Sequence, residues 1–203
     1  ASHNPSKYNG YKVYGDDGCQ MTSESANAVL AKINAVDIFD GVKTQSFQSC
    51  LEQGTVEYIS QEVIDSFLQH VMSQQVNPEA ARKAGLKVVY TPLNGTGNKP
   101  VRKILEMMGI TNVAVVPEQE NPDGNFPTCP YPNPEIKQAL EKGIELCESL
   151  SYDMLLATDP DADRVGIAVK HNGDYVLLTG NEVGALLMDY IAKNCNEKGT
   201  MPK

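Results

Sequence analysis

The stretch YDMLLATDPDADRVGIAV, residues 152–169, joins two apolar runs through a cluster of aspartates. The first run, from Tyr152 to Ala157, predicts a strand, and the second, from Val165 to Val169, predicts another. In parallel α/β sheets, ligands bind beyond the carboxyl ends of the strands. The aspartates, which begin at Asp159, therefore lie where a ligand-binding site is expected in such a sheet.

Strands and helices alternate along the chain before this stretch. Strand-like runs occupy residues 86–91 and 113–116, and helix-like segments occupy residues 100–108 and 134–150. Strands that alternate with helices of this length need right-handed crossovers and form a mostly parallel sheet. The fold class we expect is α/β, a three-layer α/β/α domain with a mostly parallel mixed sheet.

The segments around this core carry different signals. The Asn172-Gly173 step separates the second apolar run from another strand at 175–178 and is typical of a hairpin turn. A last helix is expected over residues 182–193. Five prolines between residues 120 and 134 exclude regular structure, and the aromatic residues among them favour an ordered loop at the edge of the sheet.

Two helices are expected before the sheet. Residues 24–36 carry apolar side chains on one helical face, which predicts a helix that faces a core. Residues 37–60 are mostly polar and suit a connection between two domains. An apolar stripe from Val63 to Met72 predicts a second helix, which Asn77-Pro78 should stop.

The composition indicates a folded protein that does not bind polyanions. The chain has 203 residues, of which 41% are apolar, so it can bury one or two cores. Its net charge of −9 repels nucleic acids and anionic bilayers, so we expect neither as a partner. The five cysteines contain no C-x-x-C pair, and no apolar run has the length of a membrane helix. We expect a cytoplasmic protein, and the absence of an initiator Met suggests a piece of a longer chain.

The aspartate cluster is the strongest candidate for a metal site. Asp159, Asp161 and Asp163 stand two residues apart, so their carboxylates point to one side of an extended loop. Their mutual repulsion is relieved by a hard divalent cation with oxygen ligands. A calcium loop of the EF-hand type is disfavoured, because Arg164 and Lys170 replace its required Gly and Glu. Aspartates that merely cap turns in solvent remain an alternative, against which Arg164 suggests a phosphoryl group beside the metal.

The chain opens with ASHNPSKYNGYK, in which Asn4-Pro5 and Asn9-Gly10 form turns. These turns can fold Ser2 and Lys12 toward each other. A hydrolase triad is disfavoured, because adjacent Ser and His residues do not usually hydrogen-bond and G-x-S-x-G is absent. A serine that carries a phosphoryl group fits better, since its phosphate supplies oxygens to a metal.

Two motifs resemble one enzyme family when taken in order. ASHNPSKYNGYKVY is similar to the phosphoserine loop, and ATDPDADRVGIAV to the magnesium loop, of the α-D-phosphohexomutase superfamily, the phosphoglucomutases and phosphomannomutases. The segments TPLNGTG, NPDGNFPT and LLTGNEVGALL are also similar to family segments, so the resemblance covers nearly the whole chain. TPLNGTG lacks the P-loop signature and is expected to be a structural strand-to-helix turn with no catalytic role.

The resemblance implies a ligand set for Mg²⁺. Asp159, Asp161 and Asp163 match the three aspartate ligands of the family, and Ser2 matches the serine whose phosphate supplies another ligand.

The resemblance also implies catalytic roles. Ser2 matches the residue that holds the transferable phosphoryl group. His3 and Lys12 match basic residues beside it, of which Lys12 is the better general acid/base candidate. Arg164 matches the arginine that contacts the transferring phosphate.

The implied activity is the interconversion of hexose 1-phosphate and hexose 6-phosphate through a phosphoserine and a 1,6-bisphosphate. Pro160 in the magnesium loop favours glucose as the sugar. Phosphomannomutase, phosphopentomutase, a phosphatase that releases inorganic phosphate and a non-catalytic phosphosugar-binding homologue are alternatives.

Family members have four domains, so the resemblance implies a division of this chain into three parts. Residues 1–58 would be the end of domain 1, residues 59–174 domain 2, and residues 175–203 the start of domain 3. The remaining domains of the longer protein are then expected partners, and the chain by itself is expected to have no appreciable mutase activity.

Overall fold

The computed structural model describes residues 3–8 and 12–201. The chain divides into two compact units. One holds residues 12–64, and the other holds residues 3–8 together with residues 65–201. Each unit is described by itself.

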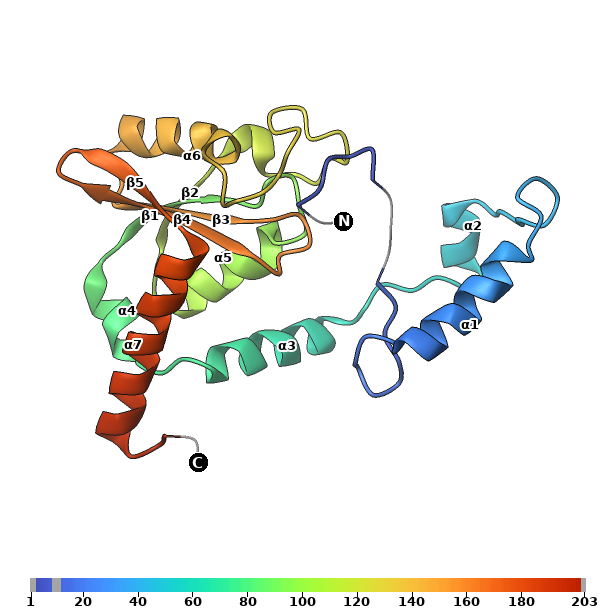
Figure 1. Ribbon diagram of the computed structural model, residues 1–203, viewed down its shortest axis with the longest axis horizontal. Helices are drawn as coiled ribbons and strands as arrows, with labels where there is room; N and C mark the ends of the chain where they lie inside the picture. The colour runs from blue at the N-terminus through green and yellow to red at the C-terminus, as the bar shows by residue number, and fades with distance from the viewer. Residues whose placement is uncertain (1–2, 9–11, 202–203) are drawn as a thin grey trace. The chain divides into compact units, whose positions relative to one another are not determined.

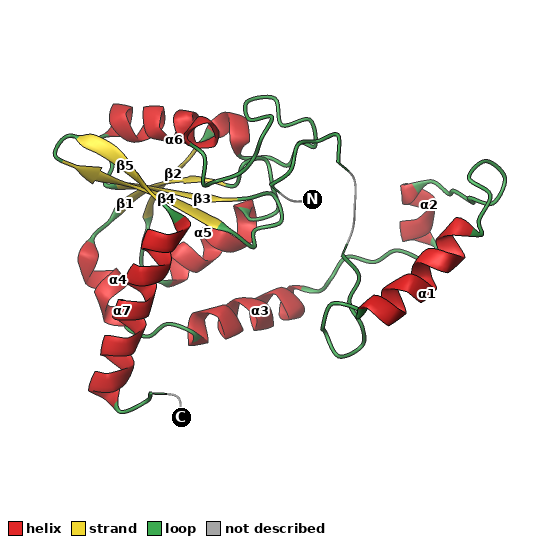
Figure 2. Cartoon of the chain, in the orientation of Figure 1, coloured by secondary structure: helices red, strands yellow, loops and turns green. Residues whose placement is uncertain are grey.

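The larger unit is built on a five-stranded sheet (Figures 1 and 2). Its strands are β1 (Lys87–Thr91), β2 (Asn112–Val115), β3 (Met154–Thr158), β4 (Val165–His171) and β5 (Asp174–Leu178), in the order β2-β1-β3-β4-β5. β1 pairs in parallel with both β2 and β3, whereas β4 is antiparallel to β3 and to β5. The expected mostly parallel mixed sheet is confirmed, with the antiparallel strands together at one edge.

Helices cover both faces of the sheet (Figure 1). Consecutive residues of a strand point to opposite faces, and β1 shows this directly. Val89 packs in a buried cluster with Leu140 of α6 (Lys137–Leu150), whereas Val88 packs with Leu105 of α5 (Asn98–Met107). α4 (Pro78–Ala84) joins the α5 side through Ala81. The three-layer α/β/α architecture follows from this alternation of apolar residues.

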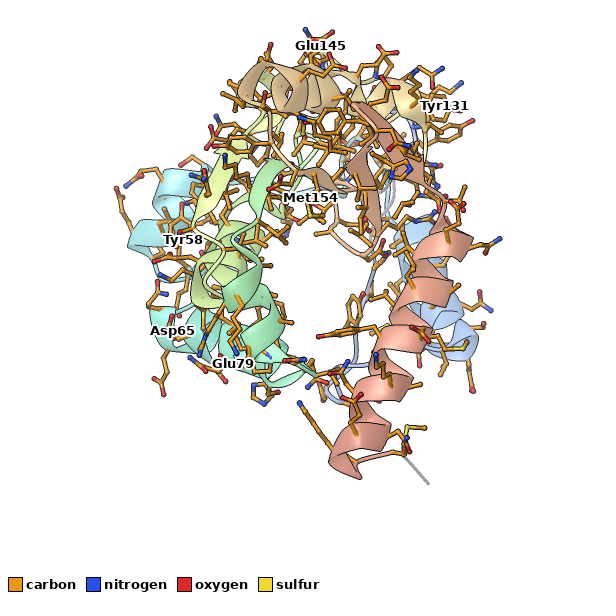
Figure 3. All side chains as sticks on the ribbon, turned by 90° about the vertical axis from the view of Figure 1, so that its left-hand side faces the viewer. Tyr58, Asp65, Glu79, Tyr131, Glu145 and Met154 are labelled. Carbon is orange, nitrogen blue, oxygen red and sulfur yellow. The ribbon has the colours of Figure 1, made fainter. Side chains whose placement is uncertain are left out.

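The side chains of the sheet and of α6 show the same layering. Figure 3 shows Glu145 on the outer side of α6 and Met154 on the sheet. Glu145 is exposed, and Met154 packs beside the buried Val88 cluster. The charged side of α6 thus faces solvent while its apolar side faces the strands.

The connection between β4 and β5 has the predicted hairpin geometry. Asn172 and Gly173 have φ values of 52° and 97°. Positive φ at both central residues is what a tight turn between twisted antiparallel strands requires, and Asn and Gly adopt it at low cost. This prediction from the sequence is confirmed.

The loop between η1 (Pro117–Gln119) and α6 is ordered without helix or strand over residues 120–134, as predicted. Phe126 and Cys129 are buried, and Cys129 packs with Leu93 and Ala139. Tyr131, the other aromatic residue of the loop, is 56% exposed. The buried side chains of Phe126 and Cys129 therefore anchor the loop, whereas Tyr131 does not.

The expectations at the two helices before the sheet need corrections. α1 (Ser23–Asn34) forms, but it has no buried residue, and Leu30 and Ile33 are about half exposed, so it does not face a core in this chain. A helix buries its apolar face only against other elements, and in this unit the second described helix is the six-residue α2 (Phe47–Glu52). α2 was not predicted. Its N-terminus is capped by Ser46, whose side chain accepts a hydrogen bond from the Ser49 N–H.

Asn77-Pro78 does more than stop a helix. α3 (Gln61–Ser73) ends before it and buries only Leu68 among its residues. The side chain of Asn77 then accepts a hydrogen bond from the Ala80 N–H at 3.3 Å, with Pro78 in the first turn of α4. This is a helix N-cap, so the same residues begin a helix that was not predicted.

The last helix is longer than predicted. α7 spans Gly180–Lys198 and begins with a capping box between Thr179 and Glu182. The predicted boundary between residues 174 and 175 falls at the start of β5, which pairs with β4 in the sheet. The division into 1–58, 59–174 and 175–203 stays a prediction.

Candidate metal centre

The aspartate loop lies at the carboxyl end of β3, where residues 159–164 connect β3 to β4 (Figure 2). β1 has its parallel neighbour β2 on one side and β3 on the other. The chain therefore runs from β1 to the neighbouring strand on one side, β2, and then back past β1 to the strand on its other side, β3. Such a switch point is where open α/β sheets bind their ligands, beyond the carboxyl ends of the two central strands. The aspartates follow the carboxyl end of β3, one of these two strands.

The structure brings the three carboxylates together. Asp159, Asp161 and Asp163 each have an oxygen within 4.8 Å of an oxygen of the other two. Asp159 is fully buried, Asp161 is half-buried and Asp163 is exposed. The set offers oxygen atoms alone, which are the ligands that hard divalent cations take. These three residues could hold a metal ion.

Asp159 is fixed by its own loop. Its Oδ1 accepts hydrogen bonds from the backbone N–H groups of Asp163 at 3.1 Å and Arg164 at 3.0 Å. Its backbone carbonyl accepts a further bond from the Ala162 N–H at 2.9 Å, and Ala162 has a φ of +59°. The turn therefore curls around the carboxylate and holds Oδ1 in one place.

The environment of the second oxygen of Asp159 fits a bound cation. Oδ2 is buried and has no hydrogen-bond partner among the described residues. A buried charged oxygen without a partner is costly. A bound divalent ion would satisfy this atom, so the residues present fit a metal.

The electrostatics of the loop support the same conclusion. The pKa of Asp159 is raised from 3.8 to about 6. Burial is the main cause, followed by the adjacent carboxyl group of Asp161 and the negative charge of Asp163, while the Arg164 N–H opposes the shift. A positive charge beside such a carboxyl group would stabilise its ionised form, so the site suits a cation.

The other predicted site residues differ in their exposure and in the unit to which they belong. Arg164 follows the loop, and its side chain is exposed. His3 is half-buried and belongs to the same unit as the aspartates. Lys12 is exposed and belongs to the other unit, and Ser2 lies outside the described residues. The structure thus brings together the aspartate set and leaves the roles of Ser2, His3, Lys12 and Arg164 as predictions.

The contact between the β1–α5 turn and the aspartate loop was not predicted from the sequence. The β1–α5 turn forms as the expected strand-to-helix turn, but it also contacts the aspartate loop. The Thr96 N–H donates to the Pro160 carbonyl oxygen at 2.9 Å. The glycines at positions 95 and 97 were the available signal, because closely spaced glycines often mark an approach of two backbones.

None of the described helices combines the length and apolar character that crossing a membrane requires.

The chain is similar to proteins of one enzyme family. The family model "Phosphoglucomutase/phosphomannomutase, alpha/beta/alpha domain II" matches residues 65–173, and the model of domain I of the same family matches residues 1–38. A phosphoribomutase of Saccharomyces cerevisiae is 40% identical over 206 residues, covering 94% of this chain and 32% of that protein. A phosphoglucomutase of Staphylococcus saprophyticus is 34% identical over 201 residues, covering 98% of this chain and 36% of that protein.

A solved structure shares the fold. A phosphoglucomutase/phosphomannomutase family protein from Burkholderia thailandensis superposes with a TM-score of 0.59 at 20% identity, covering 95% of this chain and 37% of that one. The chain spans about a third of the length of the curated relatives that it matches. Because the domain II model alone matches more than half of its residues, the chain belongs to the phosphoglucomutase/phosphomannomutase family.

Proposed function

We propose that this chain forms part of a phosphosugar mutase, an isomerase that moves a phosphoryl group between two hydroxyls of one sugar through a phosphoserine. The observation that carries the proposal is the buried Asp159, with its unpartnered Oδ2, in the loop that follows β3. The family match supplies the reaction class.

The aspartate set would hold Mg²⁺, with the phosphate of phosphorylated Ser2 as a further ligand. Bound Mg²⁺ would act as a Lewis acid that neutralises charge on the transferring phosphoryl group. Asp159 would be the fixed ligand, because its Oδ1 is already held by two backbone N–H groups. Asp163 is exposed and would lie closest to solvent in the set.

The protein residues divide the phosphoryl-transfer step among them. The bond between Ser2 Oγ and phosphorus breaks as the accepting sugar hydroxyl forms a new bond to phosphorus. The proton of that hydroxyl passes to a base and the released Ser2 Oγ takes up a proton, with Lys12 as the general acid/base candidate. The product is a 1,6-bisphosphate. After the bisphosphate has reoriented in the site, its other phosphoryl group is transferred to Ser2 Oγ. His3 and Arg164 would stabilise negative charge on the phosphoryl oxygens, a contribution that is often the largest in such reactions.

The sugar is proposed to be glucose, with a pentose as the second candidate. The relative named phosphoglucomutase supports glucose, and the more similar relative named phosphoribomutase supports a pentose 1-phosphate and 5-phosphate pair. Sugar and distal phosphate recognition would come from domains outside this chain, in line with the proposed division at residues 58 and 174.

A cytoplasmic location is part of the proposal. All five cysteines are free thiols, and burial raises the pKa of Cys129 and Cys147 to about 11. Cysteines that stay unpaired suit a reducing compartment.

The proposed phosphoserine is tested by Ser2→Ala in the full-length protein that contains this chain. We expect conversion of glucose 1-phosphate, primed with a trace of hexose 1,6-bisphosphate and Mg²⁺, to fall by at least about 10³-fold, because the covalent phosphoryl carrier is lost. Mannose 1-phosphate and ribose 1-phosphate are assayed in parallel to identify the sugar.

Ser6→Ala is the matched control, since Ser6 is an exposed serine in the same loop. Its activity should stay within about twofold of wild type. Equal activity of Ser2→Ala and wild type would refute the phosphoserine, and release of inorganic phosphate without isomerisation would indicate a phosphatase.

The raised pKa of Asp159 predicts how metal binding depends on pH. Below a pH of about 6 the carboxyl group is protonated in the metal-free chain, so a proton must leave before the cation binds. The apparent dissociation constant for Mg²⁺ should therefore rise about tenfold for each pH unit below 6 and level off above it. Titration calorimetry between pH 5 and pH 7.5 measures this, and an affinity that is constant down to pH 5 would contradict it.

A further inference from the structure

The residues of the aspartate loop alternate between two roles. The candidate ligands are residues 159, 161 and 163. Thr158, Pro160 and Ala162, which flank or separate them, all lie against the β1–α5 turn, residues 92–97. The loop is a turn closed by the bond from the Ala162 N–H to the Asp159 carbonyl oxygen, and the residues beside and between the candidate ligands are the ones that contact the β1–α5 turn.

The central contact of this arrangement is at Pro160. Its carbonyl oxygen accepts two hydrogen bonds from Thr96, one from the backbone N–H at 2.9 Å and one from Oγ1 at 3.1 Å. A Cβ on Gly95 would lie 2.3 Å from Pro160 Cα and 2.6 Å from its carbonyl oxygen. The backbone of the β1–α5 turn is therefore in contact with the backbone of the aspartate loop at Pro160. This residue lies between the candidate ligands Asp159 and Asp161.

The contacts on either side of Pro160 extend the same surface. The Tyr90 hydroxyl and Thr158 Oγ1 form a buried hydrogen bond of 2.8 Å just before Asp159. A Cβ on Gly97 would lie 2.6 Å from the Tyr90 hydroxyl, 2.7 Å from Thr158 Oγ1 and 3.4 Å from the Ala162 Cβ. The turn therefore touches the loop before, between and beyond the first two candidate ligands.

The turn is itself held in place from behind. The side-chain amide of Asn94 donates to the carbonyl oxygens of Glu118 at 3.2 Å and Asn121 at 2.9 Å, and its backbone N–H donates to the Gln119 carbonyl at 2.9 Å. Leu93 and Asn94 both have positive φ, at 48° and 56°. A conformation of this kind persists only where its surroundings determine it. The turn on which the aspartate loop rests is thus held by three hydrogen bonds to residues 118–121.

We propose that Thr96 is a positioning residue for the metal ligands, which raises metal affinity by holding the Pro160 peptide and with it the spacing of Asp159 and Asp161. Thr96 is exposed. Water can therefore replace its hydroxyl at the Pro160 oxygen with little loss of fold stability. What the hydroxyl adds is a second, directional bond to the peptide between two ligands. Groups that orient metal ligands in this way commonly change metal affinity by 10–100-fold.

The inference rests on the proposed Mg²⁺ site, and the test separates the two. Mg²⁺ binding to the 203-residue chain is measured by titration calorimetry at pH 7.5 for wild type, Thr96→Val and Thr96→Ser. Valine keeps the shape of threonine and its N–H but removes the hydroxyl, whereas serine keeps the hydroxyl. We expect the dissociation constant to rise about tenfold in Thr96→Val and to stay within about twofold of wild type in Thr96→Ser. The urea midpoint should be the same for all three proteins, which a purely structural role would not produce.

Equal affinity of wild type and Thr96→Val overturns the role of Thr96 and leaves the metal site standing. Absence of Mg²⁺ binding by wild type at millimolar concentration overturns the metal site and the inference together. If Thr96→Val does not fold, Thr96→Ala, which needs less space, takes its place with the same expected loss.

Discussion

Replacement of Asp159 by Asn is expected to abolish measurable Mg²⁺ binding and, at the same time, to make the metal-free chain more stable at neutral pH. The amide keeps an oxygen that accepts the bonds now made by the Asp163 and Arg164 N–H groups. It removes the charge whose burial raises the pKa of Asp159 to about 6. Since the group ionises at about 3.8 in the unfolded chain, the folded state binds its proton more tightly, and its contribution to stability falls as pH rises from about 4 to about 6.

The size of this effect follows from the pKa difference. Each unit corresponds to about 1.4 kcal/mol, so keeping Asp159 ionised above pH 6 costs the metal-free fold on the order of 1–3 kcal/mol. The Asn variant should gain this amount at pH 7.5 and nothing at pH 4. Metal binding should weaken by at least about 100-fold, because the buried fixed ligand loses its charge.

Asp189→Asn serves as the control, because Asp189 is an exposed aspartate on α7. Urea denaturation in the presence of EDTA gives the free energy of unfolding, and titration calorimetry gives the metal affinity. If Asp159→Asn were less stable than wild type at pH 7.5, ionised Asp159 would not destabilise the metal-free fold. If it bound Mg²⁺ as wild type does, Asp159 would not be a metal ligand.

Gly166→Ala is expected to destabilise the larger unit by about 3 kcal/mol or more, because the added methyl group has nowhere to go. A Cβ at this position would lie 2.1 Å from the Pro134 carbonyl oxygen and 2.8 Å from its carbonyl carbon. The obstacle is backbone, which cannot move aside as a flexible side chain can. β4 must therefore separate from β3 or the loop before α6 must leave the sheet.

The matched control is Gly124→Ala, in the same loop, where an added Cβ meets nothing within 4 Å. Its free energy of unfolding should change by less than about 0.5 kcal/mol. Urea denaturation followed by circular dichroism measures both variants. Wild-type stability of Gly166→Ala would show that the loop of residues 120–134 does not press on β4 as the structure has it.

The sequence by itself determined the features that depend on neighbouring residues. Apolar runs identified the five strands of the sheet, the first three from their separation by helix-length segments, and the Asn172-Gly173 step identified the hairpin from its need for positive φ. The spacing of Asp159, Asp161 and Asp163 predicted a group of carboxylates after a strand, and one oxygen of each lies within 4.8 Å of the others, in a turn and not in the extended loop that was expected. Each of these signals lies within a few residues, where propensity and geometry act directly on the chain.

Only the tertiary structure decided what depends on contacts between distant segments. Residues 24–36 have a helical apolar face, yet whether that face is buried depends on what packs against it, and in this chain α1 buries none of its residues. The burial of Asp159, in contrast with the exposure of Asp163, follows from the position of the loop between β3 and β4 and not from the identity of the residue.

The contact between Thr96 and Pro160 joins residues 64 positions apart. It exists because β1 and β3 are parallel neighbours whose carboxyl ends bring their following turns together. No local pattern records such a pairing, since it arises only when strands from separate parts of the chain align. The sequence therefore named the candidate metal ligands, and the fold alone showed what holds them in place.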